Sequence, residues 1–265
     1  MDSTLRQPAY VRTLESFIDT AHTLSRRYSQ HPYFLAADVS LIPILGTALL
    51  TDALRPEATW WKLFLSMAVF HTLGYNLYLW AKKRLIRNGS RSAIQDIALA
   101  VIPQNLLLCA VMGVPVARTV DFLGLGLPAM LAVYRVGCLV SGCCYGRPHP
   151  HGIRYQGRHI YGASTRLRQY NPGPCPPVPV RPVQLLDACA QLSALAAVLI
   201  TATLSDTVPL LPVYLLGYCI LRIPLDRMRG HRHRPTYGRL SEAQWSALFV
   251  ATAAAAWLTA SLTTG

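Results

Sequence analysis

Long apolar runs limit what this chain can fold into more than any other feature of the sequence. A helix needs about 20 mainly apolar residues to cross the hydrocarbon core of a bilayer. About seven runs approach this length, at residues 34–54, 58–81, 93–113, 119–141, 183–204, 208–225 and 242–262. Together they use most of the chain and leave no room for a separate soluble domain. We therefore predict an all-α fold, a polytopic helical membrane protein with about seven transmembrane helices.

The charged residues lie in the loops between these runs. Hydrophobic residues make up 52% of the chain and charged residues 14%, and the formal net charge is +13. A basic balance can suit nucleic acid, but here no soluble face carries the charge, and anionic lipid headgroups are the nearer partner. We therefore expect no nucleic acid partner. Loops 82–92, 147–181 and 226–239 hold most of the arginines, and the positive-inside rule places all three in the cytoplasm.

Two segments outside the apolar runs have a composition of their own. Residues 1–32 contain "VRTLESFIDTAHTLSRRY", which has helical amphipathic spacing but no apolar core of a signal peptide. We predict an interfacial helix there and a single transmembrane domain over residues 33–265. Within that domain, residues 147–182 form a long loop, because the prolines of "NPGPCPPVPVRP" prevent regular helix. Loops of this length are often functional.

The stretch "YRVGCLVSGCCYGRPHPHG", residues 134–152, places an arginine inside an apolar run. At bilayer depth an arginine costs a few kcal/mol on insertion scales. Arg135 and Arg222 either extend to the interface on long side chains or converge on an anionic headgroup, since a guanidinium grips phosphate with two parallel hydrogen bonds. Arg147 and Arg229 flank the ends of the same two runs on one membrane face. We therefore predict that these arginines form a lipid-phosphate site.

Other polar and small residues lie on the same predicted face. Asp226 follows Arg222 by four residues and shares its helix face, so it either orients that arginine or forms an ordinary interfacial ion pair. Gln184 and Asp187 open the fifth run. Three glycines interleave with the arginines and allow close packing or sharp turns: Gly137, Gly142 and Gly146.

The seven cysteines are an odd number and lie mostly inside apolar runs, which argues against a disulfide framework. With His149 and His151 nearby, Cys143 and Cys144 could bind a metal ion, but this is no standard zinc spacing. A covalent role, in which one thiol accepts a lipid group, is a second alternative. Small buried packing residues are the favoured interpretation.

Three blocks of the sequence resemble one known family. "RVGCLVSGCCYGR" is similar to the signature of bacterial prolipoprotein diacylglyceryl transferases, in the form R-x-G-C-x-x-x-G-C-C-Y-G-R. "RPVQLLD" resembles the family's H-P-x-Q-L-Y-E block. "LRIPLDRMRG" with "YGRLSEAQWSAL" resembles its late arginine-rich helix end and the S-x-x-Q opening of its last helix. The resemblance covers roughly residues 70–250.

The resemblance implies a multi-pass protein of the bacterial cytoplasmic membrane. Members of the family that it resembles bind phosphatidylglycerol, move the diacylglyceryl group to the thiol of a lipoprotein precursor peptide, and release glycerol phosphate. It implies no metal or other cofactor. Arg135 and Arg229 match essential arginines that would neutralise charge developing on the leaving phosphate, and Cys143 is a further catalytic candidate. The matching residues expected to bind substrate are Gly142, Tyr145, Gly146, Arg147, Gln184, Arg222 and Asp226.

The chain also departs from the family pattern. Cys138 and Cys143 replace the usual Asn and Glu of the signature, and Arg181 and Leu186 replace His and Tyr of the second block. The catalytic histidine of the family's H-G-G segment should fall near residues 102–105, where this chain has "IPQN".

The missing histidine leaves several functions open. An ordinary thiol is only a few per cent ionised at neutral pH, so attack without a base would be slow unless nearby arginines lower the pKa of the thiol. His71 lies too early in the chain to be an obvious substitute. One alternative is a divergent member that acts on another acceptor, or a non-catalytic lipid-binding protein. Another is a cysteine-based redox or metal enzyme. The family also places its site outside the cytoplasm, against the charge pattern of the loops.

Overall fold

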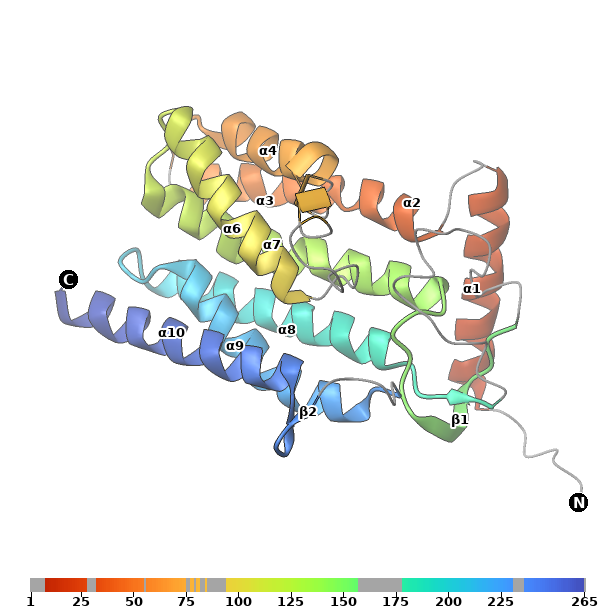
Figure 1. Ribbon diagram of the computed structural model, residues 1–265. Helices are drawn as coiled ribbons and strands as arrows, with labels where there is room; N and C mark the ends of the chain where they lie inside the picture. Colours follow the sequence, from red (N-terminus) through yellow and green to blue (C-terminus); the bar gives the residue numbers. More distant parts are fainter. Residues whose placement is uncertain are drawn as a thin grey trace, which may run out of the picture.

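The computed structural model describes residues 8–27, 32–54, 56–74, 77–78, 80–81, 84, 94–156, 178–230 and 236–264. This part of the chain is mainly helical (Figure 1). The helices are α1 (Ala9–Arg27), α2 (Pro32–Val39), α3 (Leu41–Leu54), α4 (Trp60–Val69) with the π-helical turn η1 (Phe70–Gly74), α6 (Ile94–Val111), α7 (Val116–Val140), α8 (Val183–Leu204), α9 (Leu210–Met228) and α10 (Glu242–Thr264). The strands are β1 (Pro148–Ile153), β2 (Thr236–Tyr237) and β3 (Leu240–Ser241).

The all-α membrane fold is confirmed, but the number of spans is not. In the described residues, 4 helices are long and apolar enough to cross a bilayer: Leu35–Leu54, Val116–Val140, Val183–Leu204 and Ala243–Thr263. The third predicted run gives the shorter apolar helix Ala100–Val111. The second run changes from α-helix to π-helix at Phe70, and most of its continuation lies outside the described residues, as do most of the basic loops.

Helix α7 forms the centre of the bundle, with α2, α3, α6, α8 and α9 packed around it (Figure 1). Phe122, Leu123 and Leu125 on this helix are completely buried. The outer helices instead carry large apolar side chains on their surfaces; for example, Leu204 is 80% and Phe249 77% exposed. Such a surface is unfavourable in water but fits the hydrocarbon of a bilayer.

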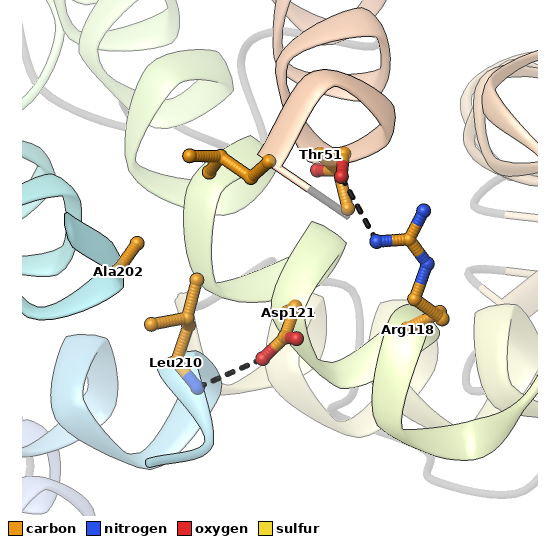
Figure 2. A pocket seen from close by; sticks show the side chains of 6 residues that line it. Thr51, Arg118, Asp121, Ala202 and Leu210 are labelled. Atoms are coloured by element: carbon orange, nitrogen blue, oxygen red, sulfur yellow. Dashed lines mark hydrogen bonds between the residues drawn. The ribbon is translucent and has the colours of Figure 1, made fainter. Parts of the chain in front are cut away.

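The N-terminal end of α7 is fastened to its neighbours by two buried polar residues (Figure 2). The Arg118 guanidinium donates a hydrogen bond to the Thr51 carbonyl at 2.9 Å and forms ion pairs with Asp52 at 3.4 Å and Glu57 at 3.1 Å. Asp121 accepts a hydrogen bond at 3.3 Å from the backbone N–H of Leu210, at the start of α9. Because the first N–H groups of a helix have no partner within it, this contact fixes where α9 begins.

Helix α1 crosses the opposite end of the bundle, beside β1 (Figure 1). The Tyr10 hydroxyl donates to the His151 carbonyl at 2.9 Å, and the His22 ring lies 2.8 Å from the Val140 carbonyl in a buried hydrogen bond. Ile18 is buried in a small apolar cluster at the end of α7. Helix α1 therefore covers the segment that follows α7, and its interfacial position remains a prediction.

Gly124 sets the distance between α7 and α9. A Cβ atom at this position would lie 2.5 Å from the backbone carbon of Leu210 and 2.7 Å from the nitrogen of Leu211, closer than atoms can pack. We expect Gly124→Ala to lower the free energy of unfolding by about 1–3 kcal/mol, measured by thermal unfolding in detergent. Gly217→Ala on α9 is the matched control, because its Cβ would meet nothing within 4 Å. Equal stability of the two variants would contradict this packing.

Candidate active site

Backbone hydrogen bonds join three segments that are far apart in the sequence. Gly146 pairs with Arg229 as an antiparallel bridge, and the Arg147 N–H donates to the Met228 carbonyl at 3.0 Å. On its other side the Gly146 N–H donates to the Arg181 carbonyl at 2.9 Å. The signature segment therefore lies between the second and third blocks of the family resemblance.

Two glycines of the signature make this arrangement sterically possible. A Cβ on Gly146 would lie 2.5 Å from Val183 Cγ2 and 2.8 Å from the Arg181 carbonyl oxygen. Gly142 has φ +63°, in the left-handed region that favours glycine. Both residues shape the backbone of the segment, a role that fits their expected place beside a substrate.

Three arginines meet at one buried carboxylate. Asp187, on α8, is fully buried. Its Oδ2 accepts a hydrogen bond from Arg229 at 2.6 Å and another from Arg222 at 3.3 Å. The Nε of Arg135, on α7, lies 2.8 Å from the same oxygen and forms an ion pair with it. The predicted convergence of Arg135 and Arg229 is thus observed, although they meet at an aspartate of the chain itself.

A second carboxylate supports the edge of this cluster. Asp226 Oδ1 lies 3.9 Å from an Arg222 nitrogen, and its Oδ2 accepts a hydrogen bond from the Ser241 hydroxyl at 2.5 Å. Ser241 also begins α10 in a capping box: its N–H donates to Gln244 Oε1 at 3.0 Å, and the Gln244 N–H donates back to its hydroxyl at 3.2 Å. The S-x-x-Q pattern therefore connects the start of the last helix to the arginines.

The cluster has more positive charge and more donors than its own acids can satisfy. Among the residues that the structure describes, three guanidinium groups face two carboxylates, which leaves one positive charge in excess. The Nε atoms of Arg222 and Arg229 are buried without a hydrogen-bond acceptor among the described residues. An uncompensated buried charge is unfavourable, and in low dielectric it attracts an opposite charge strongly. The site is therefore suited to bind an anion.

Cys143 lies in the loop after α7, where Gln184, three residues before Asp187 on α8, holds its backbone. Its carbonyl accepts a hydrogen bond at 2.6 Å from Gln184, whose side chain also reaches the Tyr155 hydroxyl at 3.4 Å. Hydrogen bonds with the thiols of Cys138 and Cys144, together with burial, raise the pKa of Cys143 well above its ordinary value. On its own, Cys143 is therefore a protonated thiol at neutral pH and a poor nucleophile.

The other predicted residues lie around the cluster. The side chain of Arg147 is exposed, so it is not part of the buried group. Tyr145 is half-buried, with its ring centroid 6.4 Å from that of Tyr155. Where the family histidine is expected, Asn105 is buried and accepts a hydrogen bond from Ser66 at 2.7 Å. The side chain of His71 lies outside the described residues.

The central role of Asp187 is not apparent from the sequence alone, where it is one of two polar residues at the start of an apolar run. The family resemblance did indicate it, because Asp187 occupies the position of the acid that ends the family's H-P-x-Q-L-Y-E block. Gln244 stood in the sequence only as part of the family's S-x-x-Q block, although a serine followed three residues later by glutamine is also a known helix-start pattern.

Replacing the shared acid tests the electrostatics of the cluster. Asp187→Asn removes the charge that holds three guanidiniums together, and we expect it to lower the free energy of unfolding by about 3–5 kcal/mol, as for a broken buried ion pair. Asp38→Asn, an exposed position on α2, is the control. Chemical unfolding in detergent measures both, and an unchanged stability of Asp187→Asn would show that the acid does not hold the arginines.

Comparison with known proteins agrees with this geometry. The family model of prolipoprotein diacylglyceryl transferase matches residues 93–260, more than half of the chain and all residues of the arginine cluster. No curated protein sequence matches the chain. With the family's signature, second block and late arginines assembled at one site, this chain belongs to the prolipoprotein diacylglyceryl transferase family.

Proposed function

We propose that this protein transfers the diacylglyceryl group of phosphatidylglycerol to the cysteine thiol of a lipoprotein precursor, in the bacterial cytoplasmic membrane. Members of its family are transferases that act on lipid and lipoprotein precursor substrates. The observation that carries the proposal is the meeting of Arg135, Arg222 and Arg229 at Asp187 with one positive charge in excess.

A phosphodiester headgroup has the charge that this cluster lacks. It carries one negative charge, which would balance the excess, and its oxygens can accept the hydrogen bonds that the buried Nε atoms of Arg222 and Arg229 do not make. Arg135 and Arg229 are proposed to contact the phosphate directly. Asp187 positions both guanidiniums and prevents their mutual repulsion from spreading them apart.

The same arginines would favour the transition state over the bound lipid. As the thiol sulfur bonds to the glyceryl carbon, the carbon–oxygen bond to phosphate breaks and the electron pair leaves with glycerol phosphate. The phosphate group then gains negative charge. Fixed positive charges in a site that excludes water stabilise this change without reorganisation. Arg222 and Asp226 are proposed to hold the cluster in place during the step.

The loop residues are proposed to form the edge of the substrate site. Gly142 and Gly146 let the backbone approach closely, and Gln184 holds the loop through the Cys143 carbonyl. Tyr145 and the exposed Arg147 lie at the outer side, where a guanidinium attracts anionic headgroups.

A second function is favoured by one observation. The segment expected to hold the catalytic histidine contains Asn105, whose side chain is fully buried and hydrogen-bonded to Ser66 and to the Val101 carbonyl. An amide held in this way is no general base. A non-catalytic lipid-binding protein, or a transferase with another acceptor, would keep the arginine cluster and lack this base.

Labelled phosphatidylglycerol and a lipobox peptide test the proposal in purified protein. We expect release of glycerol phosphate, reduced about 100- to 1000-fold by Arg135→Gln and by Arg229→Gln, as for loss of a charge-stabilising donor. Arg12→Gln, an exposed position on α1, is expected to retain activity. The measurement is the rate of glycerol phosphate release.

The outcomes separate the two functions. Lipid binding that depends on Arg135, without glycerol phosphate release by the unmodified protein, would support the non-catalytic alternative. Release that is unaffected by either arginine variant would contradict the proposed role of the cluster. Complementation of a bacterial strain depleted of its own transferase provides an independent measurement in the cell.

A further inference from the structure

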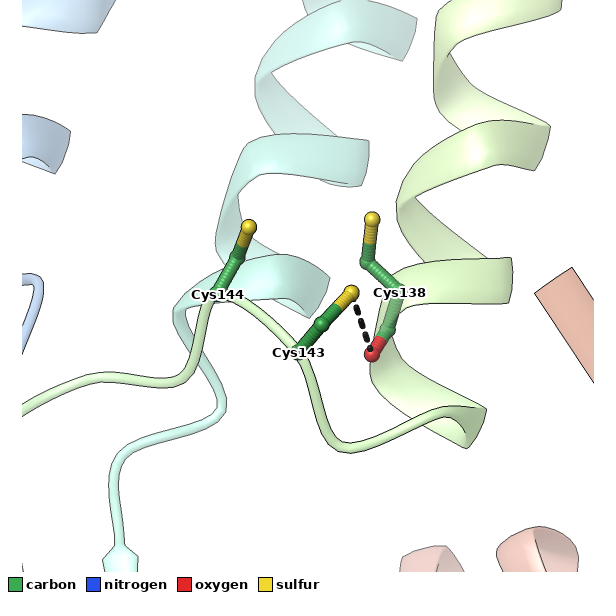
Figure 3. A group of neighbouring side chains, drawn as sticks. All are labelled: Cys138, Cys143 and Cys144. Carbon is green, nitrogen blue, oxygen red and sulfur yellow. Dashed lines mark hydrogen bonds between the residues drawn. The ribbon is translucent and has the colours of Figure 1, made fainter. Parts of the chain in front are cut away.

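The thiols of Cys138, Cys143 and Cys144 form a compact group at the end of α7 (Figure 3). Their sulfur atoms all lie within 4.8 Å of one another. Cys138 belongs to the last turn of α7, and the loop that follows folds back onto it, with a 3.7 Å contact from the Cys143 sulfur to the Cys138 carbonyl. The sequence offered His149 and His151 as the nearest further ligands, with no standard zinc spacing, whereas the structure brings Cys143 and Cys144 to an earlier cysteine.

Cys144, the last of these three residues, has a strained backbone conformation. Cys144 has φ +58°, a left-handed conformation that is unfavourable for a residue with a side chain, by about 1–2 kcal/mol. Together with Gly142 at φ +63°, it turns two consecutive side chains toward Cys138. Strain of this kind persists where the surrounding structure enforces it and is frequent at functional sites.

The spacing of the sulfur atoms is close to that of a zinc–thiolate centre. With Zn–S bonds of about 2.3 Å in tetrahedral geometry, neighbouring sulfur atoms lie about 3.8 Å apart. Small side-chain rotations would bring the observed group to this distance. Among the described residues, no imidazole or carboxylate completes the group as a fourth ligand. Three protein ligands with one open position are the pattern of catalytic rather than structural zinc.

The surrounding charges favour an anionic metal complex. Three thiolates and a zinc ion carry one net negative charge. Arg135 interacts electrostatically with Cys138 and Cys144, and Arg229 interacts with Cys144. Nearby guanidiniums therefore favour negative charge on these sulfur atoms. Cys138 and Cys143 are buried, whereas Cys144 is partly exposed, so we expect an acceptor to approach from the side of Cys144.

We propose that Cys138, Cys143 and Cys144 bind a zinc ion whose open coordination position takes the thiol of the acceptor cysteine. The identity of that acceptor rests on the proposed function. Zinc drives a coordinated thiol to release its proton, here to solvent, and so supplies the thiolate that the missing histidine would otherwise generate. The sulfur then bonds to the glyceryl carbon, and the carbon–oxygen electron pair leaves with glycerol phosphate.

Metal content and cobalt spectroscopy test this site in the full-length protein in detergent. We expect about one zinc per chain by elemental analysis and, after exchange, thiolate-to-cobalt charge-transfer absorption. Both should be lost in Cys138→Ser and Cys144→Ser and retained in Cys189→Ser and Cys219→Ser, whose cysteines lie outside the group. Adding a lipobox peptide should change the cobalt spectrum, whereas its cysteine-to-serine counterpart should not. Circular dichroism checks that each variant is folded.

Several results would overturn the proposal. The first two are the absence of zinc and cobalt uptake, and uptake by the Cys138→Ser and Cys144→Ser variants equal to that of the unmodified protein. The others are a disulfide among the three cysteines in freshly purified protein, and a cobalt spectrum that does not change when the thiol peptide is added. If the spectrum responds to the thiol but no glycerol phosphate is released, the metal site stands and the proposed transfer reaction fails.

Discussion

Three guanidinium groups share a single buried carboxylate, and the organisation of the site depends on this interaction. Asp187 Oδ2 connects Arg135 on α7, Arg222 on α9 and Arg229 just after α9, so one acid joins α7, α8 and the end of α9. Water cannot relieve the remaining charge, because all four residues are buried. A bound anion can compensate this charge, and the backbone bridge between Gly146 and Arg229 keeps the arginines in place before the anion binds.

The two ends of α7 use the same residue type for different purposes. At one end, Arg118 alone faces two carboxylates and the Thr51 carbonyl, so its charge is more than balanced and its role is to fasten helices. At the other end, about 25 Å away along the helix axis at 1.5 Å per residue, three arginines face two acids. The balance of charge, rather than the presence of arginine, distinguishes an anchor from an anion site.

Much of this arrangement could be predicted from the sequence, because a charge inside an apolar run requires a partner. That reasoning identified Arg135, Arg222 and Arg229, and the family blocks placed them in order. Asp187 was harder to recognise, since its role depends on contacts between helices that no local pattern encodes. The cluster of the three cysteines depends on Gly142 and Cys144, whose left-handed backbone conformations fold the loop back onto the end of α7. The length pattern also predicted about seven spans, and 4 helices of the described residues are long and apolar enough to cross a bilayer. The second run, for example, changes from α-helix to π-helix at Phe70.

Selective binding of a phosphate headgroup is the most direct test of this account. Native mass spectrometry can compare phosphatidylglycerol with diacylglycerol of the same acyl chains, so that the two lipids differ only beyond the glyceryl oxygen. The account predicts that the unmodified protein prefers phosphatidylglycerol by at least about tenfold, or about 1.4 kcal/mol, and that the preference disappears when Arg135 and Arg229 are both changed to glutamine. Equal affinity for the two lipids, or a preference that survives the double substitution, would contradict it.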